Sequence, residues 1–247
     1  MNNDLCVILI AHNEDKNIGA MLDGLLKNYP REILEIIVVD DASTDQTRAI
    51  VESWMKRDRR IRLVERKLPC GVGRALRAGF SHISRDAAYV LLMDSDFTEN
   101  ISQVSLLINA MDNNGYDGVI GSRFIKGGRL IHYPLAKKIM NRLFHFIVKG
   151  MFNISQDDLT NNFKFYKTSV IKDMPWRSND YAMNAETGIF PILAGYRIGE
   201  VPISWVGRTP QMGRSKFHLW KVGLSYVRVI AYARDFSESQ RKHRPDR

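Results

Sequence analysis

Cysteine is scarce in this chain, which has two among its 247 residues. Cys6 and Cys70 form neither a CxxC pair nor a His/Cys cluster, which argues against a disulfide framework and against a zinc site. No apolar run reaches the roughly 18 residues that a membrane span needs. The run at 6–11 is too short for a signal peptide and lacks its positive leader. We therefore expect a protein of the reducing cytosol that is soluble or peripheral to a membrane.

Positive charge predominates, with a formal net charge of +9 and an isoelectric point near 9.6. Such a chain is expected to meet anionic partners: nucleic acid, a phosphate-rich ligand or an anionic membrane surface. We expect no nucleic acid among them. The sequence has no zinc-finger, RNP or helix-turn-helix signature, and acidic residues line the predicted ligand edge described below.

The first half of the chain alternates between apolar runs and helical patterns. Continuous apolar, β-branched runs predict buried strands at 5–11, 33–39, 61–64, 88–93 and 118–121. Apolar periodicity predicts helices at about 16–28, 44–57, 72–84 and 101–113. This alternation predicts an α/β fold with a mostly parallel, Rossmann-like sheet flanked by helices. Ligands bind such sheets at the carboxyl ends of the strands.

The pattern changes after about residue 130, where two basic amphipathic helices are predicted, at 134–152 and about 216–234. One face of the first is apolar, and it carries Leu135, Ile139, Leu143, Phe146, Ile147 and Met151. The other face is basic, and it carries Lys137, Lys138, Arg142, His145 and Lys149. Helices of this composition can lie in a membrane interface, although most are ordinary surface helices. A polar tail is expected at 235–247.

Acidic clusters follow three of the predicted strands: HNE at 12–14, DDASTD at 40–45 and DSD at 94–96. In a parallel sheet these clusters meet at one edge. Two carboxylates with one spacer can hold Mg²⁺ or Mn²⁺ over the phosphates of a substrate. Alternatively, DSDFT matches the DxDxT pattern of haloacid-dehalogenase-type phosphohydrolases, in which Asp94 would be the nucleophile and Asp96 the acid/base. The turn within 66–80, which opens a helix beside basic residues, suits a diphosphate.

Together these motifs resemble a known family. AHNE (11–14), DDASTD, GVGRA (71–75), DSD and GSRF (121–124) occur in the order found in family 2 glycosyltransferases with the GT-A fold. Downstream, DLTNNFKFY (158–166), GYRIGEVPISWVGR (195–208) and GRSK (213–216) resemble dolichyl-phosphate mannose synthases and related polyprenyl-phosphate glycosyltransferases. The resemblance covers about residues 5–232.

The resemblance implies a metal-dependent, inverting transfer of a hexose to a dolichyl-type polyprenyl phosphate, with mannose from GDP-mannose favoured. An acceptor phosphate is already ionised, so no general base is needed. Another sugar donor such as UDP-glucose, or a non-lipid acceptor, remains an alternative. The resemblance also implies one catalytic domain over 1–234, with a nucleotide-sugar half at about 1–125 and an acceptor half with interface helices at about 126–234. The protein would act at the cytosolic face of a membrane, alone or through an anchoring subunit.

Residue roles carry over from the resemblance position by position. The residues implied in nucleotide-sugar binding are Ala11, Asn13, Glu14, Val39, Asp41, Lys67, Gly73, Arg74, Asp94, Ser95, Arg208 and Lys216. Arg123 and Lys137 are implied to bind the acceptor phosphate. The implied metal ligands are Asp94 and Asp96, with Thr98 as a further candidate, and the implied catalytic residues are Asp94, Asp96 and Arg123. The chain departs from the family at Ala11, His12 and Thr98, and DLTNNFK stands where the family has a DLTSGFR-like segment.

Overall fold

A single mixed sheet organises the protein. The computed structural model describes residues 3–207 and 219–243. Within them, seven strands form a sheet in the order β3-β2-β1-β4-β7-β5-β8, and β6 pairs with β9 beside it. The first half contains β1 (Leu5–Ala11), α1 (Ile18–Asn28), β2 (Ile33–Asp41), α2 (Thr47–Met55), β3 (Ile61–Arg66), α3 (Val72–Ser81), β4 (Tyr89–Asp94), η1 (Thr98–Gln103), α4 (Val104–Asn114) and β5 (Gly118–Ser122).

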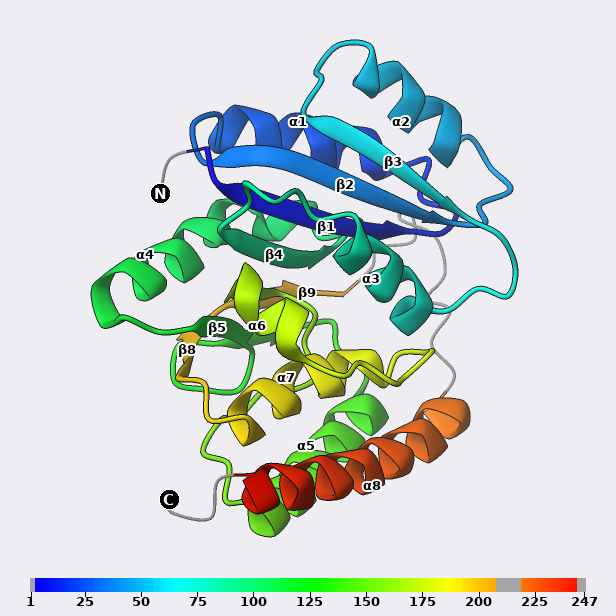
Figure 1. Cartoon of the computed structure of the whole chain (residues 1–247). Coiled ribbons are helices and arrows are strands. Elements are labelled where there is room, and N and C mark those ends of the chain that lie inside the picture. The colour runs from blue at the N-terminus through cyan, green and yellow to red at the C-terminus, as the bar shows by residue number, and fades with distance from the viewer. Residues whose placement is uncertain (1–2, 208–218, 244–247) are drawn as a thin grey trace.

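The second half is arranged differently, as Figure 1 shows. It contains β6 (Arg129–Ile131), α5 (Leu135–Phe152), β7 (Lys164–Lys167), α6 (Thr168–Asp173), α7 (Met183–Leu193), β8 (Ile198–Pro202), β9 (Ser204–Val206) and α8 (Leu219–His243). Strands β1 to β4 pair in parallel, as do β5 and β8, whereas β7 runs antiparallel between β4 and β5. The prediction of a mostly parallel α/β sheet is confirmed.

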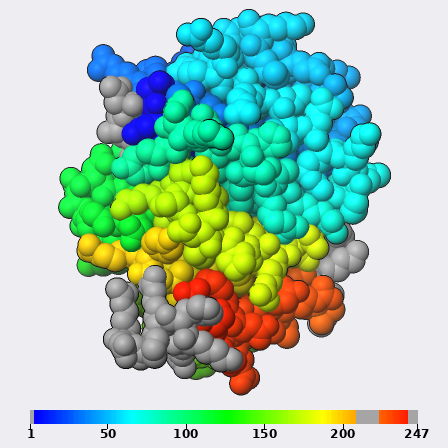
Figure 2. Space-filling model, viewed as in Figure 1, coloured from blue at the N-terminus to red at the C-terminus, as the bar shows by residue number. Residues whose placement is uncertain are grey.

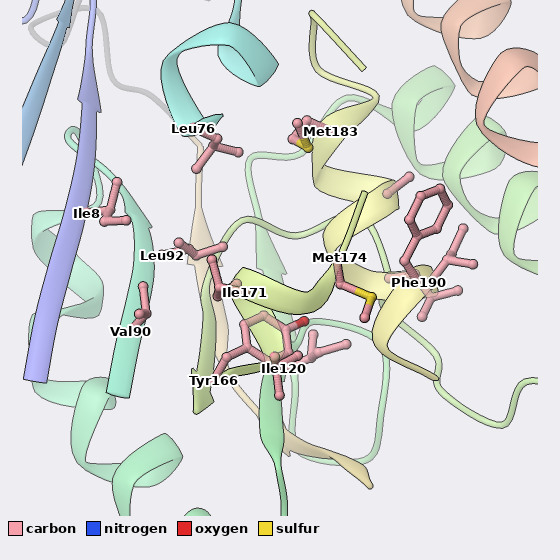
Figure 3. Close-up of a cluster of buried hydrophobic side chains, with 14 of the residues drawn as sticks. Ile8, Leu76, Val90, Leu92, Ile120, Tyr166, Ile171, Met174, Met183 and Phe190 are labelled. Carbon is pink, nitrogen blue, oxygen red and sulfur yellow. The ribbon is translucent and has the colours of Figure 1, made fainter. Parts of the chain in front are cut away.

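Helices cover both faces of the sheet. Successive side chains of a buried strand point to opposite faces, so each strand contributes to the core on both sides. On β1, Leu5, Val7 and Leu9 pack in one core cluster with α1 and α4, whereas Cys6 and Ile8 pack in another with α3, α6 and α7. Figure 3 shows part of the second cluster, where side chains of the sheet lie beside those of α6 and α7. Continuous apolar runs therefore identified these strands correctly.

Helices α5 and α8 lie side by side below the sheet (Figure 1). The rings of Phe144 on α5 and Tyr226 on α8 are 4.6 Å apart. Helix α8 was predicted to end near residue 234, but it continues to His243. Phe236 explains the difference, because its ring stacks on Phe190 of α7 at 4.9 Å. In the space-filling view, α8 closes the lower end of the molecule beneath the segment that contains α7 (Figure 2).

Candidate active site

The loops that follow β1 and β2 are bound to one another by hydrogen bonds. The backbone N–H of Asn13 donates to Ser43 Oγ at 2.9 Å, and Thr44 N–H donates to Asn13 Oδ1 at 2.7 Å. Glu14 N–H donates to the hydroxyl of Thr47 at the start of α2, at 2.7 Å. Asn13 has a positive φ of 55°, which asparagine tolerates better than most residues. The two acidic loops therefore form one rigid rim.

Asp41, at the end of β2, is a structural centre of this rim. One carboxylate oxygen forms an ion pair with Arg66 at the end of β3, and the other accepts the N–H of Gly71 at 2.6 Å. The backbone oxygen of Asp41 accepts a hydrogen bond from His12 Nδ1 at 2.8 Å. Asp41 is only 3% exposed. A nucleobase would therefore be one more hydrogen-bond partner of the Asp41 carboxylate, which already binds Arg66 and the N–H of Gly71.

The glycines of the turn at 71–75 are required by a neighbouring backbone segment. A Cβ at Gly71 would lie 2.2 Å from the Asn179 oxygen, and a Cβ at Gly73 would lie 2.2 Å from the Ser178 oxygen. Glu186, buried on α7, accepts both the N–H and the hydroxyl of Ser178. Burial raises the pKa of Glu186 above its usual value, although these hydrogen bonds oppose the shift. The turn that was interpreted as a diphosphate site therefore rests on α7 through this loop.

The DSD motif stands at the end of the central strand β4, as the sequence predicts. Ser95 is buried and donates to the Ile10 oxygen at 2.8 Å, which leaves Asp94 and Asp96 half-buried at the sheet edge. Asp94 Oδ1 accepts a hydrogen bond from Asn162 Nδ2 at 2.8 Å. Within residues 3–207 and 219–243, no group of three or more His, Cys, Asp or Glu residues could hold a metal ion. Two carboxylates nevertheless fit Mg²⁺ or Mn²⁺ when substrate phosphates complete the coordination.

Arg123 lies just beyond β5 and is bound by Asp158. The Asp158 carboxylate accepts the backbone N–H of Arg123 at 2.9 Å, its Nε at 2.7 Å and its Nη2 at 2.8 Å. Burial alone would raise the pKa of Asp158, but Arg123 outweighs it and holds that pKa below its usual value. Burial likewise opposes the charge of Arg123, and Asp158 raises the pKa of the guanidinium above normal. Nη2 also donates to Thr160 Oγ1 at 3.3 Å, so Nη1 is the part of the guanidinium that Asp158 and Thr160 do not take.

The inner face of α5 contacts the same loop. His145 is 2% exposed; its Nδ1 donates to the Asn141 oxygen at 2.7 Å, and its Nε2 accepts Leu159 N–H at 2.7 Å. Thr160 donates to Asn141 Oδ1 at 3.0 Å. Burial lowers the pKa of His145, and a ring whose Nε2 accepts a hydrogen bond is neutral. The prediction that His145 belongs to the basic face of the helix is therefore wrong, because the ring is buried against the loop at 158–160.

The apolar row predicted along α5 faces away from the protein. Its exposed fractions include 70% for Leu135, 57% for Leu143 and 77% for Phe146. On α8, Leu224 is 69% exposed and Val227 is 65% exposed. Arg142, Lys138 and Lys149 lie along the same helix as the α5 row. A large exposed apolar surface with basic neighbours is typical of an interaction site rather than of ordinary solvent-facing helix.

The structure brings most of the predicted site residues to one edge of the sheet, with exceptions. Ala11 and Val39 have fully buried side chains within the hydrophobic core. Lys67 is exposed beside the glycine turn. Thr98, the further candidate metal ligand, is the first residue of η1. Arg208 and Lys216 lie outside the described residues.

Three residues of the site were not predicted: Arg66, Asp158 and Asn162. The last two lie inside the DLTNNFK segment that was recognised as a motif, but no role followed from the sequence because their partners are distant. Asp158 pairs with Arg123 across 35 residues, and Asn162 reaches Asp94 across 68. Arg66 stands two residues beyond the strand predicted at 61–64, where its pairing with Asp41 could not be foreseen.

Comparison with known proteins decides the family. The model of the family described as glycosyl transferase family 2 matches residues 6–174, more than half of the chain. The chain belongs to this family. The membership decides against the phosphohydrolase alternative, because the DSD motif then ends the fourth strand of a transferase sheet rather than opening a hydrolase domain.

Two curated relatives of this family 2 enzyme are similar over nearly the whole chain. The undecaprenyl-phosphate mannosyltransferase of Micrococcus luteus is 27% identical over 229 residues, covering 91% of this chain and 92% of that protein. The polyprenol monophosphomannose synthase of Mycolicibacterium smegmatis is 27% identical over 215 residues, covering 85% and 79%.

Solved structures share the fold. Glucosyl-3-phosphoglycerate synthase from Mycobacterium tuberculosis, in complex with phosphoglyceric acid, superposes with a TM-score of 0.71 at 16% identity, covering 95% of this chain and 80% of that one. The same enzyme in complex with Mn²⁺ and UDP-glucose superposes with a TM-score of 0.69 at 18% identity, covering 95% and 79%. At such identities the likeness establishes the GT-A type of fold.

Proposed function

We propose that this protein transfers a hexose from a nucleotide sugar to a polyprenyl phosphate, with inversion at the anomeric carbon. GDP-mannose is the favoured donor and a dolichyl-type phosphate the favoured acceptor. The names of the two curated relatives specify a mannosyl group and a polyprenyl carrier and support that part of the choice. GDP as the nucleotide and a dolichyl-type chain are what the sequence resemblance implies. UDP-glucose is the second candidate donor, because the solved structures of the same fold include a complex with it.

One observation carries the proposal: a single short segment joins the two halves of the site. Asp158 holds Arg123 on the acceptor side, and four residues later Asn162 holds Asp94 on the nucleotide-sugar side. Between them, Asn161 Nδ2 donates to the Gly121 oxygen at 2.7 Å and fixes the segment to β5. Reacting groups bound at Asp94 and at Arg123 are therefore held in a fixed relation, which is what alignment of a displacement requires.

The chemistry follows from the charges. A phosphate oxygen of the acceptor attacks the anomeric carbon; the new carbon–oxygen bond forms as the bond to the nucleoside diphosphate breaks, and the leaving group takes the electron pair. No proton has to be removed, because the phosphate is ionised at neutral pH. Asp94 and Asp96 would hold Mg²⁺ or Mn²⁺, which when bound supplies positive charge to the departing diphosphate. Arg123, held in position by Asp158, orients the attacking phosphate.

The assay incubates the protein with GDP-mannose or UDP-glucose, Mg²⁺ or Mn²⁺, and dolichyl or undecaprenyl phosphate, and identifies the lipid product by mass spectrometry. We expect a mannosyl lipid phosphate. Asp96→Asn should lower turnover at least 100-fold, or about 2.7 kcal/mol at 1.36 kcal/mol per tenfold, with an unchanged melting temperature because Asp96 is only half-buried. Undiminished turnover in Asp96→Asn under metal-dependent conditions would refute the assignment.

We further propose that the outer face of α5 seats the protein on the anionic surface of a membrane, where the lipid acceptor resides. The exposed apolar row supplies burial, and the exposed Lys138 supplies attraction to anionic headgroups. Arg142 and Lys149 add to this positive edge, although both pair with Asp157. No helix among the described residues is long and apolar enough to cross a membrane. The exposed apolar row of α5 supports a surface-seated helix as the mode of attachment, and we propose an anchoring subunit as an additional partner.

Vesicle co-sedimentation tests this attachment. Phe146 is 77% exposed, and full burial of such a side chain stabilises by about 1.5–3 kcal/mol. Phe146→Glu should therefore weaken binding to phosphatidylglycerol-containing vesicles at least roughly fivefold. Leu106→Glu is the matched control, because Leu106 is an exposed apolar residue of α4, at 41%. Equal binding by the two variants, or no binding by the unsubstituted protein, would contradict the proposal.

A further inference from the structure

Asn162, just before β7, is hydrogen-bonded to the first carboxylate of the DSD motif. In the antiparallel pairing of β4 with β7, Leu92 stands opposite Lys164. Asp94 ends β4 two residues beyond this pair, and Asn162 precedes β7 by two residues. The two side chains meet, with Asn162 Nδ2 donating to Asp94 Oδ1 at 2.8 Å. Asn162 is 2% exposed, so the hydrogen bond is shielded from water.

The other end of this amide has no partner. Asn162 Oδ1 is buried and accepts no hydrogen bond within the part of the chain that the structure describes. Buried side-chain oxygens of native proteins are nearly always hydrogen-bonded. Of the five buried side-chain oxygens without a partner among the described residues, Asn162 Oδ1 is the one whose own amide is bound to Asp94. A nucleotide sugar bound at Asp94 would bring O–H groups to this place. The adjacent Asn161 differs, because its Nδ2 is bound to the backbone of β5.

The anchoring of the segment keeps this amide in place. Two residues on, Lys164 is fully buried, and its ammonium donates to the Leu159 oxygen at 2.9 Å, to Thr187 Oγ1 at 2.8 Å and to the Asn184 oxygen. The chain on both sides of Asn162 is thus bound to α7 and to β5. An amide held in this way cannot easily turn away from Asp94.

We propose that Asn162 is a positioning and specificity residue of the nucleotide-sugar site, an inference that rests on the proposed function. Its Nδ2 fixes the orientation of Asp94, and its Oδ1 accepts a hydrogen bond from an O–H group that arrives with the donor. That group is either a hydroxyl of the transferred sugar or a water bound to the cation. The DLTSGFR-like segment of the family has glycine at this position, and glycine can do neither.

The test measures binding to the full-length protein without turnover. Mn²⁺ binding is followed by electron paramagnetic resonance in the presence of GDP, and GDP-mannose binding is followed by calorimetry with Mn²⁺; UDP and UDP-glucose form the parallel pair. Asn162→Ala should weaken binding of the nucleotide sugar about tenfold, or about 1.4 kcal/mol. An equal loss with GDP assigns the hydrogen bond to a cation-bound water, and a loss confined to GDP-mannose assigns it to a sugar hydroxyl.

Asn162→Ser is a second variant, whose hydroxyl is too short to replace both contacts, and the melting temperature of each variant reports folding. Wild-type affinity for GDP and for GDP-mannose in a folded Asn162 variant would overturn the inference. Asp96→Asn separates the two levels of the argument. If Asp96→Asn abolishes Mn²⁺ binding while the Asn162 variants bind normally, only this inference fails. If the Asp96→Asn protein binds Mn²⁺ and nucleotide like the unsubstituted protein, the proposed function fails, and the inference fails with it.

Discussion

Removal of the Asp158 carboxylate should destabilise the protein more than removal of a surface charge. Asp158 is fully buried and Arg123 is 8% exposed. In Asp158→Ala, the guanidinium loses an ion pair and two charge-assisted hydrogen bonds and stays buried. Breaking one partner of a buried pair costs about 3–5 kcal/mol, which corresponds to a fall in melting temperature of roughly 6–20 °C for a chain of this size.

The assay is urea unfolding followed by circular dichroism, with a double-mutant cycle. Arg123→Met combined with Asp158→Ala removes both charges, so no unpaired ion is left in the interior. The double variant should be more stable than Asp158→Ala alone, because the cost arises from the orphaned guanidinium. Asp23→Ala is the control: Asp23 pairs with Lys27 on the surface of α1, and such a pair contributes about 0.3–0.5 kcal/mol.

Two results would refute this reasoning. The first is a loss below about 1 kcal/mol in Asp158→Ala, which would mean that water or another group solvates Arg123. The second is a double variant that is no more stable than Asp158→Ala, which would place the cost in lost packing rather than in an unpaired charge.

Further predictions concern the buried groups around the same segment. Burial lowers the folded-state pKa of His145, so the unfolded chain takes up a proton at this residue first as the pH falls below about 6.5. The free energy of unfolding should then fall by at most about 1.4 kcal/mol per pH unit. His145→Gln should lose this contribution, which urea titrations at pH 7 and 5.5 measure; the same change in unfolding free energy with pH in both proteins would contradict the prediction. Lys164→Met leaves the Leu159 and Asn184 oxygens without their hydrogen-bond donor. It should lower the free energy of unfolding by about 1–3 kcal/mol, measured by thermal unfolding. An unchanged melting temperature would show that water replaces the ammonium.

The strands of the first half could be predicted closely from the sequence, and the antiparallel strand could not. Strand β1 has the predicted bounds, and β2 begins as predicted and ends two residues later. The agreement is close because a continuous run of apolar, β-branched residues is typical of a strand that is buried on both faces of a sheet. Strand β7 is four residues long and begins and ends with lysine. Its neighbours β4 and β5 come much earlier in the chain. Nothing local distinguishes such a strand from a loop.

The site could be predicted in part for a similar reason. Asp94 and Asp96 follow an apolar strand directly, so the chain itself places them at the edge. The orientation of Asp94 depends on Asn162, and the position of Arg123 depends on Asp158. Both contacts form only when distant parts of the chain come together in the folded sheet. For α5 the periodicity gave the helix and its apolar face correctly, but periodicity alone does not say whether that face turns inward or outward.

The position of β7 limits how the protein can be cut or recombined. Its four residues come from the second half of the sequence but fill the slot between β4 and β5 of the first half. A fragment that stops after β5 would expose an open edge on β4 and leave β5 without either neighbour, and such edges promote aggregation. Exchange of the part of the chain after about residue 125 between related enzymes would therefore replace a central strand of the sheet, and a chimaera has to carry matching partners for β7 to fold.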